Sequence, residues 1–96
     1  HKFVIPFVPK SYKSSWAQYT LQSPNRDAYT KKFLDLGIPI MIYYPKCLHQ
    51  QSAFSYLEYK SGDFPVAELL ANEVFSVPMH PYFSDDDYAQ FDKLRL

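Results

Sequence analysis

Hydrophobic and polar positions along the first half of the chain predict a strand, a helix and a second strand. Residues 16–22 alternate large and polar side chains ahead of a Ser-Pro pair, a pattern typical of a strand. Residues 26–36 predict a helix with Asn25 as its N-cap. Residues 38–44 form a nearly continuous apolar run, which indicates a strand covered on both faces. The buried stripe of the helix is expected to consist of Tyr29, Phe33 and Leu36.

The second half of the chain predicts shorter elements. Residues 48–56 suggest a short helix, and Pro65 suits the first position of another. Residues 75–77 form a short strand, and Ser84 is expected to cap a last helix over residues 85–94. The apolar residues of the helix that begins at Pro65 recur at Val66, Leu69, Leu70 and Val74. This order of elements predicts an α+β domain in which a small sheet is covered by helices.

Length and composition place the chain among small globular domains. It has 96 residues, of which 47% are hydrophobic and 21% charged. No apolar run approaches the roughly 18 residues that span a bilayer. Ten Lys and Arg balance ten Asp and Glu, which argues against broad binding to nucleic acid or an anionic membrane. The single cysteine, Cys47, excludes an internal disulfide framework and is typical of a cytoplasmic protein.

The aromatic content of 19% is high for so short a chain. It indicates either a dense core or a surface that another part of the protein covers.

Few residues suggest catalytic chemistry. The histidines, at positions 1, 49 and 80, lack the spacing of a zinc site, and the two isolated glycines form no phosphate-binding loop. Cys47 lies two residues before His49, so a Cys–His nucleophile pair is an alternative to an ordinary thiol beside a loop. The aspartates at 85–87 fit the start of a helix better than a metal site. The residues alone therefore predict no self-contained active site.

Two segments nevertheless look specialised for ligand contact. Residues 43–46 place two phenols and an amine at the end of the apolar run, and His49 follows with two glutamines. The alternative is that both tyrosines pack against neighbours with their hydroxyl groups in water. Residues 78–82 form the second segment, for which a stiff connector with His80 hydrogen-bonded locally is the simpler interpretation.

These segments are part of a longer series of motifs. In chain order the series is Trp16-Ala-Gln-Tyr-Thr20, Leu36-Gly-Ile-Pro39, Tyr43-Tyr-Pro-Lys-Cys-Leu-His-Gln-Gln51, Gly62-Asp-Phe-Pro-Val-Ala-Glu68 and Val74-Phe-Ser-Val-Pro-Met-His-Pro-Tyr82. It resembles the C-terminal end of the DegT-type sugar aminotransferases. These are pyridoxal phosphate (PLP) enzymes that place an amino group on a keto sugar attached to a nucleotide. The resemblance covers nearly the whole chain, from about residue 16 to the last predicted helix.

The resemblance implies that residues 1–96 are the C-terminal small domain of a longer fold-type I aminotransferase. In the family, a larger N-terminal domain carries the lysine that forms the Schiff base with PLP. None of the eight lysines of this chain lies in a segment resembling that region, so the chain alone is expected to be inactive and to bind no PLP. Its implied role is to orient the nucleotide sugar at an active site built at a homodimer interface, with an amino acid as amino donor.

The same resemblance implies three substrate-binding residues and no metal site. Tyr44 matches the aromatic residue of the family's usual His-Tyr-Pro motif, whereas Tyr43 replaces the histidine and cannot carry its positive charge. His49 matches the histidine of a Pro-Leu-His stretch in which Cys47 stands in for the proline. The overall pattern is similar to members that act on UDP-linked 3-keto hexuronates, in surface-polysaccharide or amino-sugar biosynthesis.

Two other functions remain open at this point. The first is a free-standing, non-catalytic binding module that kept the small-domain fold. A severed domain should expose apolar surface and self-associate, whereas a module should be a soluble monomer that unfolds cooperatively. The second is an independent hydrolase that uses Cys47 and His49.

Overall fold

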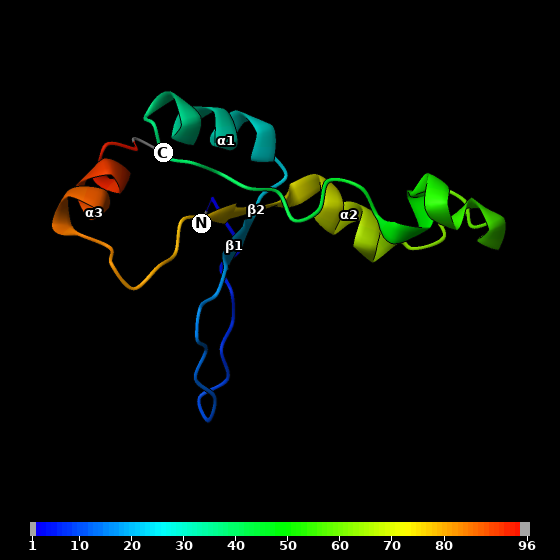
Figure 1. The fold of residues 1–96 in the computed structure, drawn as a ribbon, viewed down its shortest axis with the longest axis horizontal. Helices are drawn as coiled ribbons and strands as arrows, with labels where there is room; N and C mark the ends of the chain where they lie inside the picture. The colour runs from blue at the N-terminus through cyan, green and yellow to red at the C-terminus, as the bar shows by residue number, and fades with distance from the viewer. Residues whose placement is uncertain (1, 95–96) are drawn as a thin grey trace.

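A computed structural model describes residues 2–94 of the chain. Figure 1 shows a small central sheet, with helices α1 and α3 toward one end of the molecule and α2 leading away toward the other. The elements in chain order are β1 (Tyr19–Gln22), α1 (Arg26–Asp35), the 3₁₀ helices η1 (Leu48–Gln50) and η2 (Ser52–Leu57), α2 (Pro65–Glu73), β2 (Val74–Val77) and α3 (Asp85–Asp92). The predicted α+β class is confirmed.

The sheet consists of two paired strands with one extra pairing residue at each edge. β1 and β2 are antiparallel with Thr20 opposite Ser76, and the hydroxyl oxygens of these two residues lie 2.9 Å apart. Val4 pairs with Gln22 outside β1, and Met41 pairs with Ser76 outside β2, both in the antiparallel sense. The sheet is therefore narrow and leaves much of its stability to the helix packed on it.

The core lies between the sheet and α1. Its buried members are Leu21, Phe33, Ile38 and Phe75. The rings of Phe33 and Phe75 meet edge-to-face with their centroids 5.7 Å apart. The predicted stripe of α1 is confirmed, because Phe33 is buried and Tyr29 and Leu36 pack against the same cluster. Since side chains alternate along a strand, the core-facing positions of β1 and β2 are apolar, and Thr20 and Ser76 lie on the opposite face.

The strand predicted over residues 38–44 is wrong in extent and burial. Ile38 is buried, but only Met41 pairs with the sheet, and Met41 is itself 54% exposed. Pro39 has no N–H to donate, and beyond Met41 the chain leaves the sheet. The apolar run is therefore not covered on both faces by residues 2–94.

The boundaries of several other elements also differ from the sequence pattern. β1 begins at Tyr19 rather than at Trp16, because Trp16 has a φ of +51°, in the left-handed region that an extended strand does not use. Residues 48–56 form two successive 3₁₀ helices rather than one helix. α3 ends at Asp92.

The helix N-termini were predicted with mixed success. Asn25 occupies the N-cap position of α1, but its side chain makes no capping hydrogen bond. At α3 the predicted cap is confirmed: Ser84 Oγ accepts from the N–H of Asp87, and Asp87 Oδ2 accepts from the N–H of Ser84 at 2.8 Å.

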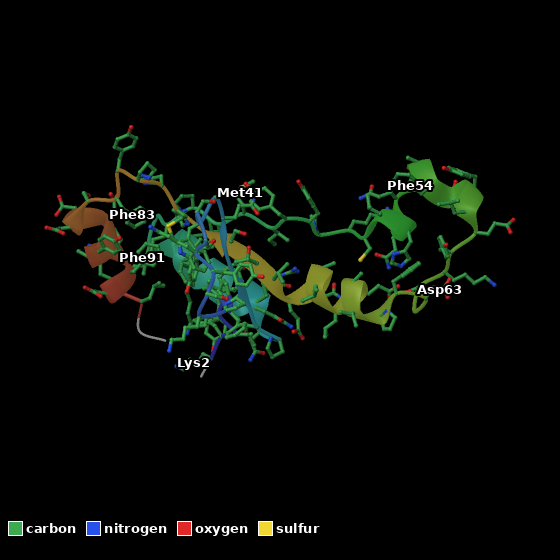
Figure 2. All side chains as sticks on the ribbon, turned by 90° about the horizontal axis from the view of Figure 1, so that it is seen from below. Lys2, Met41, Phe54, Asp63, Phe83 and Phe91 are labelled. Atoms are coloured by element: carbon green, nitrogen blue, oxygen red, sulfur yellow. The ribbon has the colours of Figure 1, made fainter. Side chains whose placement is uncertain are left out.

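Residues 43–73 form an arm that projects from the sheet, running outward through η1 and η2 and returning through α2 (Figure 1). Figure 2 shows Phe54 and Asp63 near the far end of this arm, at the opposite end of the molecule from Phe83 and Phe91. The radius of gyration is 15.9 Å, compared with about 13 Å for a compact domain of about 100 residues. No helix within residues 2–94 has the length and apolar composition needed to cross a membrane.

Candidate functional site

A hollow of about 820 Å³ lies along the arm. Residues 43–51 form one side of it, and residues 64–74 contribute the other. Its lining is mainly aromatic and aliphatic, with a few polar groups, which is the usual character of a small-molecule site. Two of the motifs singled out in the sequence, around Tyr43–Gln51 and Gly62–Glu68, therefore contribute to one place in the structure.

Tyr43 and Tyr44 both line this hollow where the chain enters the arm. Their rings meet edge-to-face at 5.6 Å, and the side chains are 39% and 73% exposed. Neither tyrosine belongs to the buried core, and the alternative in which both pack against neighbours with their hydroxyl groups in water stays open. Lys46 lines the same hollow and adds a cationic group beside them. Substrate contact by the two tyrosines remains a prediction.

His49 also lines the hollow, but its ring is held by the protein. Its side chain is only 6% exposed, and Nε2–H donates to Glu68 Oε1 at 2.7 Å. The backbone N–H of Gly62 donates to both carboxylate oxygens of Glu68, at 2.8 and 3.0 Å. These bonds lower the pKa of Glu68 below its ordinary value of 4.5, chiefly through Gly62 and then through His49. Glu68 is therefore a carboxylate at neutral pH.

Glu68 was not among the residues predicted for the site. The motif that ends at Glu68 was recognised, but nothing local in the sequence links this carboxylate to a histidine 19 residues earlier. The contact arises because α2 returns alongside η1. A carboxylate in the first turn of a helix is stabilised by the helix dipole, and that local signal alone gives no partner.

Cys47 and His49 do not form a nucleophile pair in the described part of the chain. Cys47 precedes η1 as its N-cap residue and is buried, so the two side chains are not neighbours along an extended strand. The side-chain hydrogen bond of His49 in this region runs from Nε2 to Glu68. The interpretation of Cys47 as an ordinary buried thiol is favoured.

Residues 78–82 lie away from the arm. Pro78 and Met79 line a second, smaller hollow of about 290 Å³, together with aromatic residues of β1, α1 and α3. His80 Nδ1 accepts from the N–H of Tyr82 at 3.2 Å. The interpretation of this segment as a connector with a locally bonded histidine is confirmed.

The hollow along the arm does not fit PLP as a self-contained site. Its lining residues include one amine, Lys46, and no arginine, glycine, serine or threonine that would bind a phosphate group. Residues 2–94 also contain no group of three or more His, Cys, Asp or Glu side chains that could hold a metal ion. The arrangement can bind and orient a ring-shaped ligand between aromatic side chains, with one ammonium group and two phenols at its side.

The chain therefore forms a small α+β domain with an aromatic, ligand-sized hollow along a projecting arm. The chain belongs to the DegT/DnrJ/EryC1/StrS aminotransferase family, whose model matches residues 1–92. The resemblance seen in the sequence motifs is thereby confirmed.

Several proteins of known name are similar to this chain. It is 42% identical over 69 residues to a "Pleiotropic regulatory protein" of Geobacillus stearothermophilus, covering 72% of this chain and 18% of that protein. It is 34% identical over 87 residues to the dTDP-3-amino-3,4,6-trideoxy-alpha-D-glucose transaminase of Micromonospora megalomicea, covering 90% and 23%. It is 35% identical over 77 residues to the UDP-2-acetamido-2-deoxy-3-oxo-D-glucuronate aminotransferase of Pseudomonas aeruginosa, covering 80% and 21%. The chain thus spans about a fifth of the length of these curated relatives.

A solved structure supports the same family membership. The crystal structure of a DegT DnrJ EryC1 StrS aminotransferase from Brucella abortus superposes with a TM-score of 0.79 at 40% identity. The superposition covers 95% of this chain and 24% of that one. The fold is therefore that of part of an aminotransferase of this family.

Proposed function

We propose that residues 1–96 are the C-terminal small domain of a longer PLP-dependent aminotransferase, and that this domain orients a nucleotide-linked keto sugar. The observation that carries the proposal is the meeting of two family-like segments, around residues 43–51 and 62–68, beside one hollow of about 820 Å³. Family membership over residues 1–92 supports the enzyme class. The chain's short share of its relatives' length supports its role as one domain of a larger protein.

The surface of the arm supports the presence of a larger partner. Leu48, Tyr56 and Val66 are 73%, 74% and 69% exposed, although burial of these side chains would stabilise the protein. Several large, exposed apolar side chains on one arm are the kind of surface that an interface covers. In the proposed enzyme this surface is covered by the large domain or by the second subunit of a homodimer.

The residues of the hollow have separate tasks in this proposal. Tyr44 contacts the sugar with its ring or hydroxyl group, and Tyr43 offers a neutral phenol as hydrogen-bond donor and acceptor. Lys46 supplies positive charge that suits a diphosphate. PLP, held outside this chain, supplies the electron sink for amino transfer. The residues described here bind the substrate and set its orientation, which is the step that brings the keto carbon to the cofactor.

We further propose a UDP-linked 3-keto hexuronate as substrate and an amino acid as amino donor. The relative from Pseudomonas aeruginosa, whose name specifies a 3-oxo glucuronate, supports this sugar class at 35% identity. Such a product serves amino-sugar or surface-polysaccharide biosynthesis. The lone cysteine, Cys47, supports a reducing cytoplasmic location.

The experiment is to replace Tyr44 by alanine in the longer protein and to titrate it with UDP-glucuronate, a stable analogue of the keto sugar. Loss of one aromatic and hydrogen-bonding contact, worth about 1.4 kcal/mol, weakens binding about tenfold. The absorbance of bound PLP should not change. Tyr12→Ala is the matched control, because Tyr12 is 73% exposed like Tyr44, lies outside the arm and is not among the residues lining the hollow. Loss of PLP with unchanged sugar affinity would show that the assignment of Tyr44 is wrong.

The alternative function is a free-standing binding module. The hollow alone suits it equally well, because a recess lined by aromatic side chains binds many ring-shaped ligands. The exposed arm argues against it, since a module without partners gains nothing from so much uncovered apolar surface. A stable, monomeric 96-residue protein with its own sugar affinity would favour this alternative.

A further inference from the structure

We propose that Glu68 is a positioning residue of the sugar site, which acts through His49 to hold residues 43–48 in their binding geometry. The proposal rests on the proposed function and deepens it, because it assigns His49 a different task from direct contact through Nε2. It also adds a residue, Glu68, that the sequence pattern did not place in the site.

The arm consists of an outgoing half and a returning half. The outgoing half, residues 43–57, contains the two tyrosines, and the returning half, residues 58–73, contains α2. Within the described chain, the bond between His49 Nε2 and Glu68 Oε1 is the one side-chain hydrogen bond that joins the two halves. Other hydrogen bonds there are local, such as that from Gln51 Nε2 to the carbonyl of Lys46 at 3.2 Å. The His49–Glu68 pair therefore helps to fix the position of residues 43–48 relative to α2.

The His49–Glu68 pair is held in place by neighbouring residues. Glu68 is fixed from behind, because the N–H of Gly62 donates to both of its oxygens. The ring of His49 lies 4.9 Å from the ring of Phe64, and Tyr59 packs edge-to-face on the same phenylalanine at 4.9 Å. A charge-assisted bond of 2.7 Å, with one partner 6% and the other 17% exposed, is stronger than a bond in open water.

Glu68 also determines which nitrogen of the His49 imidazole carries the proton. A carboxylate only accepts hydrogen bonds, so His49 must carry its proton on Nε2 and point that nitrogen at Glu68. The hydrogen bond at one ring nitrogen determines the role of the other. In the neutral ring Nδ1 is an acceptor, and it is the nitrogen left for a ligand in the hollow that His49 lines. Glu68 thus fixes both the orientation and the tautomer of His49.

The test uses the longer protein with PLP bound and compares Glu68→Ala, Glu68→Gln and the control Glu58→Gln. Glu58 is an exposed carboxylate on the same arm, and the described residues give it no hydrogen bond or ion pair through its side chain. The probe for direct binding is UDP-glucuronate, titrated without amino donor. The half-reaction with the amino donor is followed separately by the absorbance of the cofactor.

The expected result is a selective loss on the sugar side. Glu68→Ala should weaken UDP-glucuronate binding, and raise KM for the keto sugar, by about tenfold or more. Glu68→Gln should lose less, because its amide oxygen still accepts from Nε2 of His49, although its NH₂ group cannot accept from Gly62. The donor half-reaction, PLP content and the Glu58→Gln variant should match the wild type.

Three outcomes would overturn the proposal. The first is unchanged sugar affinity in Glu68→Ala with PLP retained. The second is an equal fall in both half-reactions, which indicates a purely structural role for Glu68. The third is a wild-type protein that binds no PLP, in which case the proposed function fails before any variant is compared. If Glu68→Ala does not fold, the isosteric Glu68→Gln takes its place. A loss confined to sugar affinity then supports the proposal, and unchanged affinity or an equal fall in both half-reactions overturns it.

Discussion

Leu48 on the arm offers a test of whether another part of the protein covers this surface. Its side chain is 73% exposed in the described chain. Full burial of a leucine side chain stabilises a protein by about 1.5–3 kcal/mol, so the part still exposed corresponds to about 1–2 kcal/mol. That stabilisation is gained only where a second surface excludes water. Leu48→Ala should therefore change the free energy of unfolding by less than about 0.5 kcal/mol in the 96-residue chain and by about 1–2 kcal/mol in the longer protein.

The assay is urea unfolding of both proteins, with and without the substitution. Leu34→Ala is the control, because Leu34 is 57% exposed on α1, away from the arm. The shift of the urea midpoint at constant slope reports the change in stability. Equal, small shifts for Leu48→Ala in the two proteins would refute the covered arm, and a large shift already present in the short chain would show that Leu48 is more buried than described.

Three further predictions concern stability. Phe75→Ala should cost about 3–5 kcal/mol and unfold the 96-residue chain at ordinary temperature, because the ring is 0% exposed at the centre of the core; a native circular dichroism spectrum would contradict this. Ser84→Ala should cost about 1 kcal/mol in thermal melting, since it removes the capping bond to Asp87; an unchanged melting temperature would count against the cap. Hydrogen bonds in the folded state lower the pKa of Glu68 below its ordinary value of 4.5, so the carboxylate stabilises the fold above that pH. This stabilisation is lost as the pH falls through the folded-state pKa. Acid unfolding of Glu68→Gln should lack this loss, and identical acid unfolding of the variant and the wild type would contradict the prediction.

The elements that could be predicted from the sequence are those determined by local patterns. The stripe of α1 was read from residues three or four apart, and Phe33 is indeed buried. The cap of α3 was read from Ser84 and the aspartates after it, and both capping bonds are present. The pairing partners of the strands were not predicted, because the antiparallel register of β1 and β2 depends on contacts more than 50 residues apart.

The apolar run at residues 38–44 shows what a local pattern does not predict. The pattern indicates side chains that gain stability from burial, but it does not say which surface covers them. In the described chain Ile38 is buried in the core, whereas Met41 and Tyr44 remain exposed. In the proposed enzyme, surfaces outside this chain would provide that cover.

The candidate site was likewise predicted only in part, because some of its contacts join segments that are distant in the sequence. Tyr43, Tyr44 and His49 were singled out by motif, and all three line one hollow. The bond from His49 to Glu68 could not be predicted, because it depends on the path of the arm out through η2 and back along α2. The structure shows His49 bonded to Glu68, and contact between His49 and the substrate stays a prediction.

In the proposed function, this chain is one domain of a larger PLP enzyme. The most direct measurement is the intact mass of the native gene product, followed by its PLP content. We expect a product several times heavier than 11.3 kDa that carries PLP. A native product of 96 residues without PLP would contradict it and would leave the binding module as the function of this fold.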